Sequence, residues 1–260
     1  MIAATTHSIH SPFSLEGHTA FISGGGTGLG FAMASAMIEA GAQVAIAGRR
    51  KEVLNQAVKE LGPRAHAVTL DITEPNACED CATILAETLG PISILVHNAG
   101  IHLKKSVRDT SVDEFTSVWQ THVQGAFALS RAFIPSMQQR RGGSILFIAS
   151  MTSLIGMPQV VAYSAAKSAY IGMVRSLACE LAEDGIRVNA IAPGWIETPM
   201  LHKALDNDPA RKAKILSRTP LARFGHACDV GRAAVYLSSA AADFVTGVVL
   251  PVDGGASIGF

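Results

Sequence analysis

Short apolar runs alternate along the chain with stretches in which apolar side chains recur every three or four residues. The strand-like runs occupy residues 20–23, 44–47, 65–70, 92–96, 144–148, 188–191 and 248–252. Between them lie amphipathic segments such as FAMASAMIEAG and KEVLNQAVKELG, which have the period of a helix. Continuously apolar strands separated by helices are typical of a parallel sheet covered on both faces. The pattern therefore predicts an α/β fold.

One polar stretch, residues 197–224, breaks this rhythm and has no strand pattern. An excursion of this length is either a disordered insertion or a lid over a ligand. Weak helical periods at 201–205 and 211–216 favour a helical substrate lid. Because no repeat or linker divides the chain, we expect one domain over residues 1–260.

Composition narrows the classes of function. The 260 residues are 48% apolar and 16% charged, which suits a globular chain with a large core. Lys plus Arg equals Asp plus Glu at 21 each, so we expect no nucleic-acid partner. No apolar stretch approaches the roughly 18 residues that span a bilayer, and the start MIAATTHSIHSPF lacks the features of a signal peptide. We expect a cytoplasmic protein with no membrane partner.

The four cysteines are too few and too irregularly spaced for a disulfide framework. Cys78 and Cys81 form a C-x-x-C pair inside a helical pattern, without a second pair or a neighbouring His that would complete a zinc site. We interpret them as ordinary helix cysteines and expect no metal.

The first strand leads into the glycine-rich turn SGGGTGLG and then into a helix. Glycine lets the backbone turn sharply and approach a pyrophosphate, whose charge then lies at the helix N-terminus. We predict a dinucleotide site formed by Ser23, Gly24, Gly28, Leu29 and Gly30.

The end of the second strand, AIAGRR, bears on which dinucleotide binds. Gly48 occupies the place of a carboxylate that would hold an adenosine ribose, and Arg49 and Arg50 follow it. The two guanidinium groups can pair with a 2′-phosphate, or they simply begin a solvated helix. We expect NADP(H) to be preferred, with NAD(H) as the alternative. Asp71 and Ile72, after the third strand, are placed to meet the adenine.

The segment AYSAAKSAY carries the most specific chemistry. Tyr163 and Lys167 are four residues apart on a helical pattern, hence on one face, where the ammonium can lower the pKa of the phenol. Ser150 ends the strand LFIAS, where its hydroxyl can hydrogen-bond a substrate carbonyl. Combined with the glycine turn, this set predicts an active site.

With these residues the sequence resembles the short-chain dehydrogenase/reductase family over essentially its whole length, from LEGHTAFISGGGTGLG through LVHNAG, SILFIAS, YSAAK and RVNAIAPGWIETPM to VTGVVLPVDGG. The resemblance implies a single Rossmann-type domain with a seven-stranded parallel sheet, and hydride transfer between nicotinamide C4 and a carbonyl or alcohol carbon. It implies Tyr163 as general acid/base, Lys167 as its pKa-lowering and ribose-binding partner, and Ser150 as the substrate-polarising hydroxyl. The other positions that match cofactor-binding segments of the family are Asn98, Ala99, Gly100, Pro193, Gly194, Ile196 and Thr198.

Within the family, AGRR, SMTSLIG and LPVDGG look most like gluconate 5-dehydrogenases and related sugar-acid or polyol reductases. We therefore expect a sugar acid such as gluconate or 5-ketogluconate as substrate, with a 3-oxoacyl or other small ketone as the alternative. Lys104, Lys105, Arg108 or His202 is the candidate cation for a substrate carboxylate, against the alternative that each is a solvated loop charge.

His122 departs from the family pattern, because the fourth catalytic residue there is an Asn three positions before a glycine. The capping-box pair Ser111 and Glu114 predicts the start of a helix in which Phe115, Trp119, His122, Ala126, Leu129 and Phe133 face inward. In the family the Asn is taken to open the helix locally and hold a water that joins the lysine to solvent.

Three hypotheses follow for His122. It preserves the relay through its two ring nitrogens; it leaves a weakened dinucleotide-binding protein that acts as a sensor or scaffold; or it binds a metal with His97. We favour the first, since Ser150, Tyr163 and Lys167 are all retained. A structural protein with an empty glycine turn is a further alternative.

The helix around Tyr163 carries an unusual number of small residues on its surface: Ala162, Ala165, Ala166, Ala169 and Gly172. Such a surface allows another helix to pack closely. The resemblance also implies a tetramer, so we expect a homotetramer formed through this helix and the helix at 111–131.

Overall fold

Seven strands form one parallel sheet in the order β3-β2-β1-β4-β5-β6-β7. The structure is a computed structural model that describes residues 11–198, 201 and 208–259. The strands are β1 (Thr19–Ser23), β2 (Gln43–Gly48), β3 (Ala65–Thr69), β4 (Ile94–His97), β5 (Gly143–Ile148), β6 (Ile186–Pro193) and β7 (Val249–Val252). Each lies within two residues of its predicted place, so the α/β fold with a seven-stranded parallel sheet is confirmed.

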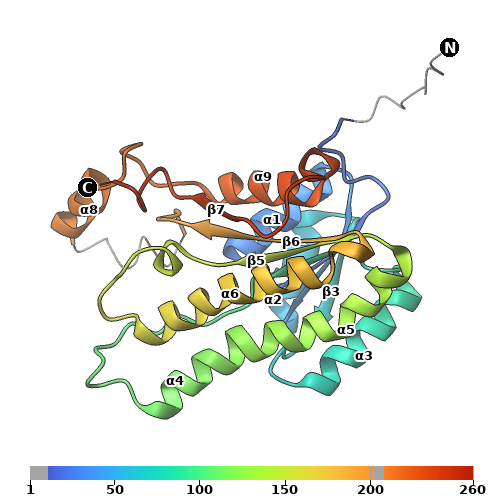
Figure 1. Cartoon of the computed structure of the whole chain (residues 1–260), viewed down its shortest axis with the longest axis horizontal. Coiled ribbons are helices and arrows are strands. Elements are labelled where there is room, and N and C mark those ends of the chain that lie inside the picture. The colour runs from blue at the N-terminus through green and yellow to red at the C-terminus, as the bar shows by residue number, and fades with distance from the viewer. Residues whose placement is uncertain (1–10, 199–200, 202–207, 260) are drawn as a thin grey trace.

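Helices cover both faces of this sheet (Figure 1). One buried layer holds α1 (Gly28–Glu39), α2 (Lys51–Leu61) and α9 (Ala227–Ser238) against the sheet. The other holds α3 (Pro75–Thr88), α5 (Gly125–Arg140) and α6 (Val161–Glu180). The side chains of each strand alternate between the two layers, as the two-residue period of a strand requires. In the part of the chain that the structure describes, no helix is long and apolar enough to cross a bilayer.

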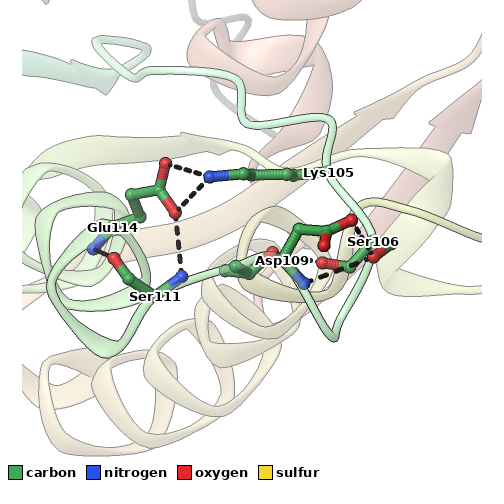
Figure 2. Close-up of polar contacts among 6 residues, drawn as sticks. Lys105, Ser106, Asp109, Ser111 and Glu114 are labelled. Carbon is green, nitrogen blue, oxygen red and sulfur yellow. Dashed lines mark hydrogen bonds and ion pairs between the residues drawn. The ribbon is translucent and has the colours of Figure 1, made fainter.

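The helix predicted from Ser111 begins with the expected capping box (Figure 2). The backbone N–H of Glu114 donates to Ser111 Oγ at 3.1 Å, and the N–H of Ser111 donates to Glu114 Oε2 at 2.8 Å. The Glu114 carboxylate also accepts from Lys105 Nζ at 2.8 Å. This contact ties the loop after β4 to the start of α4 (Val112–Trp119).

Between α4 and α5 the helix widens into a π-helical turn at Gln120–Gln124. A π turn holds more residues than an α turn, so the positions that face inward shift across it. The prediction that Trp119 faces inward is wrong: its side chain is 37% exposed and Val118 is buried in its place. The inward positions from His122 onward are confirmed.

The excursion after β6 contains α8 (Pro209–Ser217), whose first turn is capped by Asp208. The backbone N–H of Arg211 donates to Asp208 Oδ1 at 2.9 Å. Ile215 and Phe224 form a small apolar cluster with Trp195, which follows β6. Figure 1 shows α8 beyond the ends of β6 and β7 and beside the C-terminal segment. Of the two predicted helical periods, 211–216 lies in α8, whereas 202–205 falls outside the described residues.

Two of the small residues on α6 have a different role from the one predicted. Ala162 and Ala166 are buried against Val118 of α4 in the same chain, so they do not form a free surface for a second subunit. Ala165 and Ala169 are partly exposed, and the homotetramer stays a prediction.

Candidate active site

A cleft of about 1380 Å³ runs along the carboxyl ends of the strands. Such an edge of a parallel sheet, near the point where the strand order reverses, is the usual ligand site of doubly wound folds. The predicted site residues that line the cleft are Gly24, Gly28, Leu29, Arg49, Arg50, Asp71, Ile72, Asn98, Ala99, Gly100, His122, Tyr163, Lys167, Pro193, Gly194, Ile196 and Thr198. Ser23, Gly30 and Ser150 are not among the described lining residues, but Ser150 forms a hydrogen bond with Tyr163, which is.

The buried hydroxyl of Ser23 joins the end of β1 to the end of β4. It donates to the carbonyl of Val96 and accepts from the backbone N–H groups of Asn98 and Ala99, both at 3.1 Å. The side-chain amide of Asn98 returns two hydrogen bonds at 3.0 Å, to the carbonyls of Ser23 and Gly24. Ser23 thus positions the cleft wall, whereas the sequence analysis predicted that it touches the cofactor.

The glycine turn is built for close backbone approach. Gly24 has a φ of +66°, and a Cβ there would lie 2.9 Å from Ala99 Cα. A Cβ on Gly30 would overlap the Gly24 carbonyl and lie 2.6 Å from Asn98 Nδ2. Larger residues at either position would therefore push the turn away from β4.

The start of α1 offers unsatisfied donors to the cleft. Its N-cap, Thr27, makes no side-chain cap hydrogen bond, and the first turn contains no acidic residue. Thr27, Gly28 and Leu29 all line the cleft. Free N–H groups at a helix N-terminus, beside glycines that leave room for a ligand, fit the pyrophosphate of a dinucleotide.

Arg49 and Arg50 extend the cleft past the end of β2. Both are exposed, and the residue before them is Gly48, which has no carboxylate. Arg49 Nη1 lies 4.0 Å from Asp71 Oδ2, a long contact between two exposed groups that leaves the guanidinium free to bind another anion. Arg50 is the N-cap of α2, so it also begins a helix, as the alternative interpretation proposed.

Tyr163 and Lys167 lie one turn apart on α6, and Ser150 follows the end of β5. Lys167 is buried, and its Nζ donates to the carbonyl of Ile148 at 2.5 Å. Burial lowers the pKa of Lys167 to about 7, because the charged amine loses its hydration. Near neutral pH the amine is therefore present in both protonation states.

The phenol of Tyr163 behaves differently from the prediction. Burial raises its pKa, and a hydrogen bond with Ser150 opposes that shift. The net direction of the pKa shift is upward, whereas the sequence predicted a lowering by Lys167, whose own charged form is disfavoured by burial. Ser150 is thus the group that favours the Tyr163 phenolate.

His122 is buried beneath Tyr163 and its ring meets the phenol edge-on, with centroids 5.6 Å apart. Its Nε2 lies 3.1 Å from the N–H of Ile101 and 2.8 Å from its carbonyl oxygen, and Nδ1 is buried without a protein partner. Burial and the charge of Lys167 lower the pKa of His122 to about 3, so the imidazole is neutral at physiological pH. A Cβ on Gly100 would overlap this ring.

The π-helical turn presents the carbonyl of His122 to α6. The hydroxyl of Tyr170 donates to it at 3.0 Å, and Lys167 Nζ lies 4.8 Å from the Tyr170 ring centroid. Tyr170 therefore connects the π turn to the lysine. The sequence analysis missed this residue, although its position three after Lys167 places it one helical turn farther along the same face.

The metal hypothesis for His122 and His97 finds no geometric support. Nε2 of His97 lies 2.9 Å from Ser130 Oγ, and its ring packs on Phe147. No group of three His, Cys, Asp or Glu side chains that could hold a metal occurs in the described part of the chain. Cys78 and Cys81 are buried on α3, and burial raises the pKa of the two thiols to about 11 and about 12, which is consistent with ordinary helix cysteines.

Of the four cations predicted to bind a substrate carboxylate, the structure places one in the cleft wall. Lys104 lines the cleft, whereas Lys105 is not among the described lining residues. Lys105 instead pairs with Glu114 (Figure 2). Arg108 is not among the described lining residues, and His202 lies outside the described part of the chain. The sequence predicts that the loop from His102 to Arg108 shapes the pocket, and His102 does line the cleft. Its contact with Tyr163, with ring centroids 4.8 Å apart, has no signal in the sequence beyond its place after LVHNAG.

The neutrality of His122 predicts a loss of stability in acid. Below about pH 6.5 the unfolded chain binds a proton at this residue that the folded chain does not bind until about pH 3, so the free energy of unfolding falls as the pH is lowered through this window. In His122→Asn the fall between pH 6.5 and 4.5 should be shallower by about 1.4 kcal/mol per pH unit. Urea unfolding at several pH values measures this slope, with His66→Asn as the control. If the slope of His122→Asn equals the slopes of wild type and of the control, the ring is not neutral and buried.

Known proteins match the chain over almost its entire length. A family model described as Enoyl-(Acyl carrier protein) reductase matches residues 24–257. The 2-dehydro-3-deoxy-D-gluconate 5-dehydrogenase of Bacillus subtilis (strain 168) is 39% identical over 249 residues, which cover 95% of this chain and 97% of the relative. Galactitol 2-dehydrogenase (L-tagatose-forming) of Cereibacter sphaeroides is 36% identical over 249 residues, again 95% of this chain and 97% of the relative.

A solved structure is similar to this chain over nearly the same length. The gluconate 5-dehydrogenase of Burkholderia cenocepacia J2315, in complex with NADP and tartrate, has a TM-score of 0.90 to this chain at 32% identity. The match covers 96% of this chain and 98% of that protein. Sheet order, cleft and sequence thus agree with one another, and the protein belongs to the short-chain dehydrogenase/reductase family of oxidoreductases.

Proposed function

We propose that this oxidoreductase uses NADP(H) to interconvert a carbonyl and an alcohol on a sugar acid such as 5-ketogluconate and gluconate. The observation that carries the proposal is that Tyr163, hydrogen-bonded to Ser150, and Lys167 line the same cleft as a glycine turn that fits a dinucleotide. Relatives that act on gluconate derivatives, and a neighbour solved with NADP, support the substrate class and the cofactor.

In the reductive direction the chain's own residues hold the carbonyl oxygen and supply its proton. When bound, the nicotinamide supplies the hydride that the carbonyl carbon receives. The Ser150 hydroxyl and the Tyr163 phenol hydrogen-bond the carbonyl oxygen, and the phenol transfers its proton as negative charge develops there. Ser150 then stabilises the resulting phenolate, and Lys167, one turn along α6, is placed to bind the cofactor ribose.

The alternative, a weakened protein that only binds dinucleotide, explains the site less well. Burying an amine with a single hydrogen bond, from Lys167 to the Ile148 carbonyl, costs folding free energy. A scaffold gains nothing from that cost. His122 keeps the local opening of the helix, but as a neutral ring held at Ile101, so we propose that it positions Tyr163 rather than carrying charge.

Removing the Tyr163 hydroxyl should abolish turnover without preventing cofactor binding. We expect Tyr163→Phe to lower kcat by about 100-fold to 10,000-fold, the usual contribution of a positioned general acid. The assay follows loss of NADPH absorbance with 5-keto-D-gluconate, other ketoses and cyclic ketones. The thermal shift caused by NADPH should persist in the variant, because the phenyl ring remains. Turnover unchanged by the substitution would rule out the mechanism.

Cofactor preference should depend on the two arginines after β2. A charge-assisted hydrogen bond to a phosphate contributes about 1.5–3 kcal/mol, so Arg49→Ala and Arg50→Ala together should raise the KM for NADPH by at least about tenfold and leave the KM for NADH nearly unchanged. Lys51→Ala serves as the control, because Lys51 is exposed on the same segment and does not line the cleft. Equal changes for NADPH and NADH would show that the arginines do not read the 2′-phosphate.

A further inference from the structure

Three cations lie along one side of α8, the last of them its C-cap residue, Arg218. Arg211, Lys214 and Arg218 follow one another at steps of three and four residues, and all three line the cleft. With 3.6 residues per turn, these steps place them on a common face of the helix. Ile215 also lines the cleft and is buried with Phe224, which fixes this face of α8 toward the site.

Among the described residues, no carboxylate forms an ion pair with the charges on this face. Lys105, by contrast, is paired with Glu114. The helix itself contains no Asp or Glu between its first and last residues. In a chain with zero formal net charge, such a group in a cleft creates a local field that attracts an anion.

This group and the cofactor arginines follow different strands of the sheet. Arg49 and Arg50 follow β2, whereas α8 follows β6, four strand spacings away in the sheet. At about 4.8 Å per spacing the two strand ends are roughly 19 Å apart. Asp71, the sole carboxylate among the described lining residues, follows β3 at the arginine end. The α8 end of the cleft is therefore the more uniformly positive.

We infer that Arg211, Lys214 and Arg218 form a subsite for the carboxylate of the substrate, so that the enzyme selects hydroxy and keto acids over neutral polyols and ketoses. The inference rests on the proposed function, because it takes the reacting carbonyl to lie at Tyr163. Trp195 lines the cleft after β6 and packs in the apolar cluster of Ile215, so α8 lies beside the cleft wall that follows β6. The planar forks of the arginines match a carboxylate, and Lys214 adds a point charge.

The test compares 5-keto-D-gluconate with L-sorbose, which has the same carbon chain and ketone but a CH2OH group in place of the carboxylate. Wild-type enzyme should have the higher kcat/KM for the acid. In Arg211→Gln/Arg218→Gln, the ratio of kcat/KM for the acid to that for L-sorbose should fall by about tenfold to 100-fold, mainly through the KM of the acid. The KM for NADPH should be unchanged.

Lys212→Gln is the matched control. Lys212 is the neighbour of Arg211 on the same helix but does not line the cleft, and its Nζ lies 6.0 Å from the Phe224 ring centroid. It should leave the acid-to-sorbose ratio within about twofold, since it removes a charge outside the subsite. An equal fall in the control and in the arginine variant would overturn the subsite, and so would a wild-type enzyme that favours L-sorbose.

A binding measurement separates this inference from the proposed function. The thermal shift that D-gluconate causes in the NADP+-saturated protein should be lost in Arg211→Gln/Arg218→Gln and kept in Lys212→Gln. If no substrate is turned over but this dependence is found, the subsite stands and the proposed reaction fails. If ketones are turned over and the shift does not depend on the arginines, the reaction stands and the subsite fails.

Discussion

The buried amine of Lys167 is the constraint on which the rest of the site depends. It reaches the carbonyl of Ile148 at the end of β5, so α6 must pack directly against that strand. Its burial brings its pKa to about 7 and leaves Ser150 as the group that favours the Tyr163 phenolate. A lysine in this place is tolerated because two apolar layers hold the sheet and its strand ends rigidly.

The π-helical turn and Tyr170 form a second support around the lysine. The turn presents the His122 carbonyl to α6, and the Tyr170 hydroxyl donates to it. The Tyr170 ring lies beneath the amine of Lys167. The imidazole of His122 fills the space that a side chain at position 100 would otherwise take. His122, Tyr170 and Gly100 thus act together, which explains how the site accommodates a ring larger than an Asn side chain.

The sequence predicted what depends on local pattern. Strand positions followed from apolar runs. Ser150 and the glycine turn followed from short motifs after strands, and Tyr163 and Lys167 from their spacing on a helix. It failed where tertiary contacts decide the outcome. The π turn changes which residues of α4 face inward. Ser23 hydrogen-bonds the backbone of the cleft wall instead of lining the cleft. Lys105 pairs with Glu114. The α8 cations were missed because their spacing has meaning only once the helix is known to face the cleft.

The most direct test of this account follows the hydride itself. NADPH deuterated at the transferred position of nicotinamide C4 is incubated with the protein and 5-keto-D-gluconate, and the product is analysed by NMR and mass spectrometry. The account predicts gluconate, or its C5 epimer, with deuterium bound to C5 and in amounts equal to the NADP+ formed. A product without deuterium at C5, or no product from a protein that binds NADPH, would contradict it.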